Sequence, residues 1–415
     1  MPINLSRYAN NIDIFKQEHE GFDEEIEKNL FRMFSRKDFY SACGVKDSTA
    51  LSNKLPEIIR VLEENSDSPV SLGEQIGGTG PYYYSLKEVY EIIEACRILE
   101  QRAKKKSKYK VTQKYRRSRA HKTGIANQKG GAGKSTSALN IAIGQALKGF
   151  QQARVLLIDY DPQGNIQKFA DGRYLNSYTT KTIFKYLMEE YDTEYSNEVE
   201  RGDFVRKELI RSSLIPNLDY CPALTNDNAI EGYLNMLELS FDDEKYAGSN
   251  VYKIFKEKFL DHVEEYYDII IIDAAPHNNT FIRALMYGID HLVVPAPTKA
   301  MDCESTLNFM YSLNETFEKF KEELGHEGLK YLDILPVMYN GSDTARKIIA
   351  IYNSMFDTKV FPHPISFRTA YEVMSNDNCS TYNYKKSEMT DAITIALTEW
   401  EKFNDSIRLT IDKNK

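Results

Sequence analysis

The chain has 415 residues, a net charge of −8 at pH 7, 42% hydrophobic and 27% charged residues. This length exceeds one ordinary core, so two domains are expected in a globular protein of ordinary composition. No apolar run is long enough for a bilayer and the N-terminus lacks signal-peptide features, which predicts a cytoplasmic protein without a membrane partner. The cysteines lack C-x-x-C spacing, which disfavours a zinc or iron–sulfur site and indicates reduced structural thiols: Cys43, Cys96, Cys221, Cys303 and Cys379.

Residues 1–34 are predicted to form an N-terminal helical segment that could support dimerisation. The stretch Glu24–Phe34 has helical spacing, and its apolar side chains share one face: Ile26, Leu30, Met33 and Phe34.

Residues 35–101 predict a small, mainly α unit with a wing. A short helix beginning near Ser35, a turn at Gly44 and a second helix from Asp47 to about Leu62 form a helix-turn-helix pattern. In that motif the second helix enters the major groove of DNA, and the candidate groove-facing residues are Ser48, Thr49, Ser52, Asn53 and Lys54.

The remainder of this unit is predicted as a hairpin and a closing helix. Gly73–Tyr84 fits a β-hairpin with Gly77-Gly78 at its turn, and Leu86–Gln101 fits a helix. The same spacing occurs in ordinary helical bundles, so a DNA-binding winged domain and a purely structural bundle both stay open.

Residues 102–122 form a basic run with eleven Lys/Arg and no Asp or Glu, which we take as the boundary between the domains. One interpretation is a solvated, flexible linker. The other is a tether that neutralises DNA phosphates and binds without sequence preference, with Tyr109 and Tyr115 stacking on bases.

Residues 123–415 begin with a glycine-rich turn that predicts a phosphate-binding loop. Residues 129–136 read Lys-Gly-Gly-Ala-Gly-Lys-Ser-Thr, between the apolar stretch Gly124–Asn127 and the helical pattern Lys134–Leu147. Glycines let the backbone wrap an anion, and N–H groups of the first helical turn point at it. The expected cradle is Gly130, Gly131, Ala132 and Gly133; Lys134 would reach the β/γ-phosphates and Ser135 would ligate Mg²⁺.

The loop departs from G-x-x-x-x-G-K-[ST] in two places. Gln128 replaces the first glycine, and a second lysine, Lys129, precedes the glycine pair. A tight strand-to-helix connection without a ligand is the structural alternative.

Apolar strands alternate with amphipathic helices through the rest of the chain. This pattern predicts an α/β fold of the P-loop NTPase type, with a mainly parallel, helix-covered sheet and ligands at the carboxyl ends of its strands. The expected helices after the first are Val251–Val263 and Glu304–Phe320. The expected strands are Gly124–Asn127, Val155–Asp159, Leu218–Cys221, Asp268–Asp273, His291–Pro295, Tyr331–Met338 and Lys359–Phe361.

Three aspartates lie at or just beyond the ends of two of these strands. Asp159 and Asp161, spaced i, i+2, lie on one face where the chain leaves the sheet, so one can organise the metal region while the other orients water. Asp273 ends a buried strand in the Walker-B manner and would hold Mg²⁺. The alternatives are an ordinary Asp-x-Asp-Pro turn and a helix-capping aspartate.

Together the three motifs resemble the deviant Walker-A ATPases of the ParA/MinD family. The Asp-Pro-Gln-Gly-Asn form and the N-terminal unit favour ParA, in its larger (type Ia) form, over MinD, and the resemblance covers residues 122 to about 340. It implies a cytoplasmic, nucleoid-associated homodimer that binds and hydrolyses Mg-ATP, binds DNA non-specifically in the ATP form, is stimulated by a ParB-type partner and represses its own operator.

The resemblance also implies residue roles. Lys129 would be the signature lysine that reaches the partner's phosphates; Lys134 and Ser135 act in cis, Thr136 serves the α-phosphate, and Asp161 positions the water. Asp159 and Asp273 would complete the metal region, and Asn340 would contact adenine, although Gly341 stands where an arginine is usual. Arg368, with Arg346 and Lys347 behind it, would contact DNA; a surface arginine with only a solvating role is the alternative.

A nucleotide-switched transcriptional repressor without significant turnover shares every one of these motifs. A MinD-like membrane organiser is disfavoured, because residues 400–415 alternate acids and bases with few large apolar side chains.

Overall fold

A computed structural model describes most of the chain. The described residues are 33–64, 66, 68–75, 80–103, 110–162, 166, 179–240, 245–276, 279–368, 370–371, 374, 380–384 and 389–413. The predicted N-terminal helix up to residue 32, the Gly77-Gly78 turn and Tyr109 lie outside them.

The small N-terminal unit contains two helices joined by a glycine turn, a third helix and a three-stranded antiparallel sheet ordered β1-β3-β2. Its helices are α3 (Arg36–Phe39), α4 (Ser48–Glu63) and α5 (Leu86–Arg102), and its strands are β1 (Phe34–Ser35), β2 (Glu74–Gln75) and β3 (Tyr82–Tyr84). The Asp47 carboxylate caps α4 by accepting the Ala50 N–H at 2.7 Å, and the Ser85 hydroxyl caps α5. The two helices around Gly44 and the paired strands β2 and β3 are therefore present, and the helix-turn-helix assignment stays a prediction.

The larger unit is built on a seven-stranded sheet ordered β10-β9-β4-β8-β5-β7-β6. All pairs are parallel except that between β6 and β7 at one edge. The strands are β4 (His121–Ile125), β5 (Val155–Tyr160), β6 (Arg211–Ser212), β7 (Leu218–Cys221), β8 (Ile269–Ala274), β9 (His291–Pro297) and β10 (Tyr331–Val337). This confirms the predicted mainly parallel, helix-covered α/β fold.

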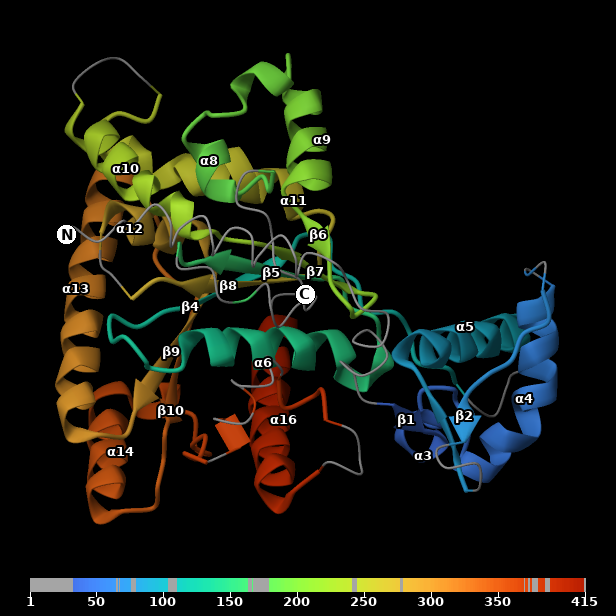
Figure 1. Ribbon diagram of the computed structural model, residues 1–415. Helices are drawn as coiled ribbons and strands as arrows, with labels where there is room; N and C mark the ends of the chain where they lie inside the picture. The colour runs from blue at the N-terminus through green and yellow to red at the C-terminus, as the bar shows by residue number, and fades with distance from the viewer. Residues whose placement is uncertain are drawn as a thin grey trace, which may run out of the picture.

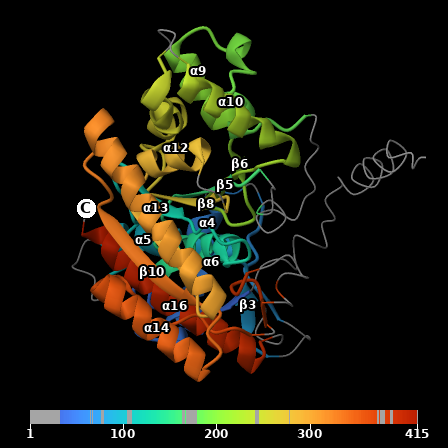
Figure 2. The same ribbon diagram turned by 90° about the vertical axis from the view of Figure 1, so that its left-hand side faces the viewer.

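Helices cover both faces of the sheet, as Figure 1 shows. On one face lie α6 (Lys134–Leu147) and α16 (Asp391–Asp412). The other apolar core contains residues from α8 (Ile183–Leu187), α9 (Glu198–Glu208), α10 (Ala229–Leu239), α11 (Asp261–Val263), α12 (Thr280–Gly288), α13 (Ala300–Leu324) and α14 (Asp343–Phe356). Figure 2 shows α13, α14 and α16 side on. None of the helices in the described part of the chain is both long and apolar enough to cross a membrane.

Four predicted elements differ in the structure. The first strand of the sheet is His121–Ile125, because residues 126–133 belong to the glycine-rich loop. No strand forms over residues 359–361, where Val360 makes a single bridge to Ile334. The helix expected over 251–263 is divided into a 3₁₀ segment, a π turn and one α turn. Phe34 lies in β1 rather than on a helical face.

Helix α6 packs against α16 through a row of buried polar contacts. Asn404 donates to the Asn140 carbonyl at 3.1 Å and its own carbonyl accepts from Gln145 at 2.8 Å. Arg408 donates to the Gln145 side chain at 2.7 Å. A Cβ on Gly144 would lie 2.1 Å from the Asn404 amide nitrogen, so glycine is required where the helices cross.

The basic run crosses from one unit to the other as ordered structure over residues 110–122. Thr112 donates its N–H to the Ala42 carbonyl at 2.9 Å. Tyr115 is buried, with its hydroxyl 2.7 Å from Asp412 and its ring 4.1 Å from the Arg408 guanidinium. The described part of the run is therefore neither a flexible linker nor a free tether, and Tyr115 is not available for stacking on a base.

One apolar core continues from the sheet into the N-terminal unit. It contains α6, α16 and the central residues of α4 and α5. At the junction, Phe150 follows α6 and its ring lies edge-on to Phe34 and Phe39, at centroid distances of 5.4 and 6.4 Å. The two units thus share a packed interface.

We predict that Phe150→Ala weakens this interface. Phe150 is half-buried, so the loss should be about 1–3 kcal/mol of unfolding free energy, below that of a fully buried phenylalanine. Urea denaturation measures it, with Leu409→Ala, whose side chain is 67% exposed, as the neutral control. Equal stability of the two variants would show that the ring contacts contribute nothing.

Candidate functional site

The glycine-rich loop joins β4 to α6 at the carboxyl edge of the sheet. Gly131 and Gly133 have φ values of 72° and 78°, which β-carbon-bearing residues rarely adopt. A Cβ on Gly130, Gly131 or Gly133 would meet no atom within 4 Å. The concave side of the loop therefore has room for a ligand at the N-terminus of α6, where helix geometry favours an anion.

Asn127 fixes the loop to the sheet. Its side-chain nitrogen donates to the Pro295 carbonyl at 2.7 Å and to the Thr306 hydroxyl at 3.0 Å, and its oxygen accepts the Lys129 N–H at 3.2 Å. Because Asn127 is buried, these bonds hold the start of the loop in one conformation.

The two lysines of the loop lie in different environments. Lys134 is buried, and its ammonium donates to the Lys129 carbonyl at 3.2 Å across the loop. The Lys129 side chain is 42% exposed and its ammonium lies 3.2 Å from the Asp302 carboxylate, in the first turn of α13. One lysine thus faces the cradle and the other lies at the surface.

The two strand-ending aspartates are neighbours. Asp159 of β5 and Asp273 of β8 are directly opposite in the parallel pair, next to Ile125 where β4 ends. Asp159 accepts the N–H groups of Asp161 at 3.3 Å and Ile166 at 3.1 Å. One carboxylate oxygen of Asp273 is buried without a hydrogen-bond partner among the described residues.

These groups perturb one another's ionisation. Burial, reinforced by the Asp273 carboxylate, raises the pKa of Asp159 well above its ordinary value. Burial also raises the pKa of Asp273 to about 7, against the opposing effects of the Ser135 hydroxyl and Lys134. The pKa of Lys134 is lowered by burial, although Asp273 and Asp161 oppose this. The site is thus short of compensating positive charge.

Mg²⁺ fits this donor set. The metal prefers oxygen ligands, and Ser135 contributes a hydroxyl beside the unpaired oxygen of Asp273. A divalent cation would also stabilise the two adjacent carboxylates in their ionised form. The residues that would hold it are therefore Ser135 and Asp273, with Asp159 behind them.

A slot of about 110 Å³ adjoins the loop on the side of α16. Gly133 and Thr136 form one wall, and aromatic residues from the C-terminal part of the chain form the others, among them Phe367, Tyr371 and Trp400. Trp400 is buried and donates its indole N–H to the Tyr371 hydroxyl at 3.1 Å. A small slot lined by aromatic and apolar side chains beside the glycine-rich loop suits a nucleobase.

Asn340 lies two residues beyond Met338, which lines the slot. Its side-chain oxygen accepts the Ser342 N–H at 3.1 Å, before α14 begins. The adenine contact of Asn340 therefore stays a prediction, because the walls of the slot come from other residues.

The predicted DNA-contacting residues lie on separate surfaces. On α4, Thr49 and Asn53 are exposed, Ser48 and Lys54 are half-buried, and the Ser52 hydroxyl accepts from Arg36. Arg346 of α14 is 61% exposed and pairs with Asp343 at 2.7 Å. Arg368 is 29% exposed and lies 4.0 Å from Glu399. These roles remain predictions.

Three site residues were missed by sequence reasoning. Asp302 and Trp400 lie more than 160 residues from the loop and carry no motif, so no local pattern could have identified them. Asn127 is the last residue of the predicted strand, and a polar side chain there, directly before the loop, was the available signal.

Comparison with known proteins places this site in a family. A family model described as "AAA domain" matches residues 120–326, which contain the loop and all three aspartates. Plasmid partition protein A of Escherichia coli is 27% identical over 278 residues, covering 65% of this chain and 64% of that protein. The chain thus spans just under two thirds of that relative.

Solved structures share the fold. One described as a partition protein matches with a TM-score of 0.64 at 19% identity, covering 98% of this chain and 97% of that one. Cobyrinic acid a,c-diamide synthase from Mycobacterium smegmatis, with a bound ATP analogue and magnesium, matches with a TM-score of 0.51 at 17% identity. That match covers 71% of this chain and 97% of that one. At these identities the likeness establishes a P-loop NTPase fold.

We predict that Asp273→Asn stabilises the metal-free protein in a pH-dependent manner. An aspartate in an unfolded chain ionises near pH 4, whereas the folded pKa is about 7. Ionisation of Asp273 therefore lowers the unfolding free energy increasingly from about pH 4, and this loss levels off above pH 7. Asparagine cannot ionise, so the substitution removes the loss. Unfolding free energy should rise by about 1–3 kcal/mol at pH 8 and by much less at pH 4.5.

Urea denaturation at the two pH values measures this difference. Asp343→Asn is the control, because that carboxylate is 86% exposed, and it should change stability by less than about 0.5 kcal/mol at either pH. A loss of stability at pH 8 in Asp273→Asn would contradict the account of the site.

Proposed function

The chain belongs to the ParA-type partition ATPases, and on that premise we propose that it binds and hydrolyses Mg-ATP as a switch in DNA partition. The observation that carries the proposal is the convergence, at one edge of the sheet, of the glycine loop with Lys134, Asp161 and the adjacent pair Asp159–Asp273. A nucleobase slot beside the loop supports it.

Each residue has a physical task in this proposal. The backbone of residues 130–133 and the Lys134 ammonium bind the triphosphate, and Thr136, at the slot, serves the α-phosphate. Bound Mg²⁺ supplies charge neutralisation at the β/γ-phosphates. Asp161, at the exit of β5, orients the attacking water. Phe367 and Trp400 enclose the base.

The position of the Lys129 side chain supports a mechanism in which two subunits act together on one nucleotide. Its ammonium is paired with Asp302 at 3.2 Å and its side chain is 42% exposed, so it is accessible to a second subunit. Its neighbour Met301 is 88% exposed, which suits a face that is buried in a homodimer. We propose that ATP-bound subunits meet on this face and that Lys129 leaves Asp302 for the partner's phosphates, where its charge stabilises phosphoryl transfer.

We predict opposite effects from the two members of this ion pair. Lys129→Ala should retain nucleotide binding, lose ATP-dependent dimerisation and reduce stimulated turnover at least 100-fold, because a trans cation is worth about 10³–10⁵ in related chemistry. Asp302→Asn should release Lys129 and increase the dimer fraction at a given ATP concentration. Sedimentation and phosphate-release assays measure both.

Lys134→Ala is the control that separates binding from dimerisation, since it should abolish nucleotide binding itself. If Lys129→Ala dimerises and turns over like the wild type, the two-subunit mechanism is wrong.

The proposed DNA functions have two parts. The ATP-bound dimer would bind DNA without sequence preference, with Arg346 and Arg368 as candidate contacts, and a ParB-type partner would stimulate hydrolysis. The small N-terminal unit would bind an operator through α4, whose Thr49 and Asn53 are exposed, and so repress transcription.

We predict nucleotide-dependent binding to a random-sequence DNA duplex. Affinity should be high with ATP, low with ADP or no nucleotide, and should fall steeply with salt, because phosphate contacts release counterions. Fluorescence anisotropy measures binding while turnover is followed in the same samples. Arg346→Ala should weaken binding several-fold; Lys359→Ala, an exposed lysine beyond the opposite end of α14, is the cation control.

Turnover in that experiment distinguishes the second candidate function. Hydrolysis that DNA and partner accelerate supports the partition ATPase. Binding without any turnover would instead make the chain a nucleotide-switched repressor and leave Asp161 without a catalytic role.

A further inference from the structure

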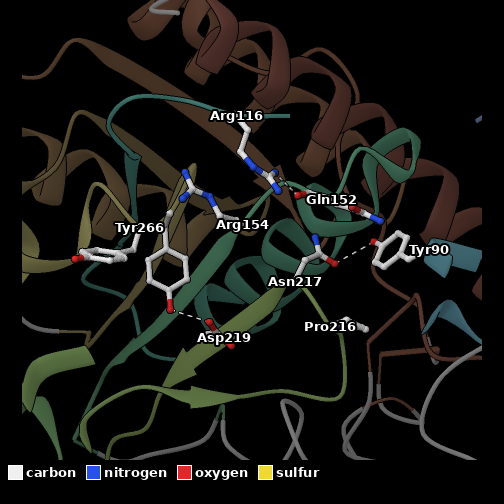
Figure 3. A pocket seen from close by; sticks show the side chains of 9 residues that line it. Tyr90, Arg116, Gln152, Arg154, Pro216, Asn217, Asp219 and Tyr266 are labelled. Atoms are coloured by element: carbon white, nitrogen blue, oxygen red, sulfur yellow. Dashed lines mark hydrogen bonds between the residues drawn. The ribbon is translucent and has the colours of Figure 1, made fainter. Parts of the chain in front are cut away.

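A cavity of about 510 Å³ lies at the junction between the N-terminal unit and the sheet (Figure 3). It opens at the amino ends of β5, β7 and β8, the sheet edge opposite the phosphate loop. Its walls come from α5 (Tyr90), the basic segment (Arg116), the residue before β5 (Arg154), the start of β7 (Asp219) and the turn before β8 (Tyr266). The nucleotide mechanism uses none of these residues.

Two arginines in this cavity share one carboxylate. Arg154 makes a two-pronged contact with Asp268, with an Nη2–Oδ1 distance of 2.9 Å, and Arg116 lies 3.6 Å from the same carboxylate. The Asp268 side chain is fully buried, whereas those of Arg116 and Arg154 are 44% and 34% exposed. One buried negative charge thus balances two accessible positive charges.

The Arg116 guanidinium keeps unused donors. Its Nη1 donates to the Gln152 carbonyl at 2.7 Å and to the Tyr115 carbonyl. Its Nε and Nη2 make no hydrogen bond within the described parts of the chain. Burial lowers the pKa of Arg116; the Asp268 carboxylate opposes this effect, and the charges of Arg154 and Arg97 add to it.

The opposite wall can accept hydrogen bonds. Asp219 accepts the Tyr267 hydroxyl at 2.7 Å and reaches the cavity, and its side chain could also accept from a hydroxyl or amino group of a ligand. Tyr266, 49% exposed, and Pro216 add apolar surface. The volume lies within the range of small-molecule sites, which is about 300–1,000 Å³.

We propose that this interdomain cavity binds a phosphate-bearing ligand of nucleotide size, with its phosphate on Arg116 and Arg154 and a polar group on Asp219. Guanidinium groups bind phosphate with paired, charge-assisted hydrogen bonds. The phosphate belongs either to a free nucleotide or to the backbone of DNA. In both cases the ligand would connect Tyr90 of the N-terminal unit to the sheet.

The first test is calorimetric titration of AMP, and separately of inorganic phosphate, into the full-length protein saturated with Mg-ADP. We expect one further site, weakened at least tenfold in Arg116→Gln and unchanged in Arg119→Gln. Arg119 is the matched control, because it lies in the same basic segment, is 66% exposed and pairs with Glu264 outside the cavity. Arg116→Lys keeps the positive charge but loses the paired donors of the guanidinium, so it should bind AMP and phosphate about three- to tenfold more weakly.

The second test separates the two sources of phosphate, using a random-sequence 20-base-pair duplex. The ligand is the DNA backbone if AMP and phosphate do not bind and Arg116→Gln, but not Arg119→Gln, lowers the affinity for DNA. In that case Arg116→Gln should also reduce the slope of log affinity against log salt concentration by about one. Thermal melting of each variant verifies folding. The proposal is overturned if Arg116→Gln and Arg119→Gln behave alike towards AMP, phosphate and DNA. Neither test depends on hydrolysis at the phosphate loop.

Discussion

The packing of α6 is the constraint on which the rest of the structure depends. Its first turn forms the phosphate cradle, its length covers β5 and β8, and the chain directly after it enters the aromatic cluster of the N-terminal unit. The close crossing at Gly144 and the hydrogen bond from the buried Asn404 side chain to the Asn140 main-chain carbonyl determine its depth and rotation against α16. A buried polar row of this kind is costly unless every group is paired, so it specifies one arrangement of the two helices.

That arrangement leaves the ligand site charged and under-compensated. Two carboxylates lie side by side at the strand ends, and Lys134 near them is itself buried. Such a site is stable only because the surrounding strands hold it, and it gains free energy when phosphate and a divalent cation arrive together.

The basic segment shows how composition can mislead. As sequence, its eleven positive charges suggested a tether for nucleic acid. In the described part, most of these cations contact carboxylates or carbonyls that belong to distant segments: Lys114 to Glu94, Arg116 and the Arg117 N–H to Asp268, Arg119 to Glu264, and Lys122 to Asp290. The described part of the run binds the two units together, and Arg116 keeps donors that no described residue uses.

The sequence by itself determined the α/β fold, the order of most strands along the chain and the cradle with its three aspartates. These features depend on local chemistry: glycines at positive φ, alternating apolar strands, and acids placed where a parallel strand ends. Only the tertiary structure decided that Lys129 pairs with Asp302, that Trp400 lines the slot beside the glycine-rich loop and that Tyr115 is buried under Arg408. Each of those contacts joins residues more than 170 positions apart, and hydrophobic periodicity carries no information about which distant helix a given face will meet.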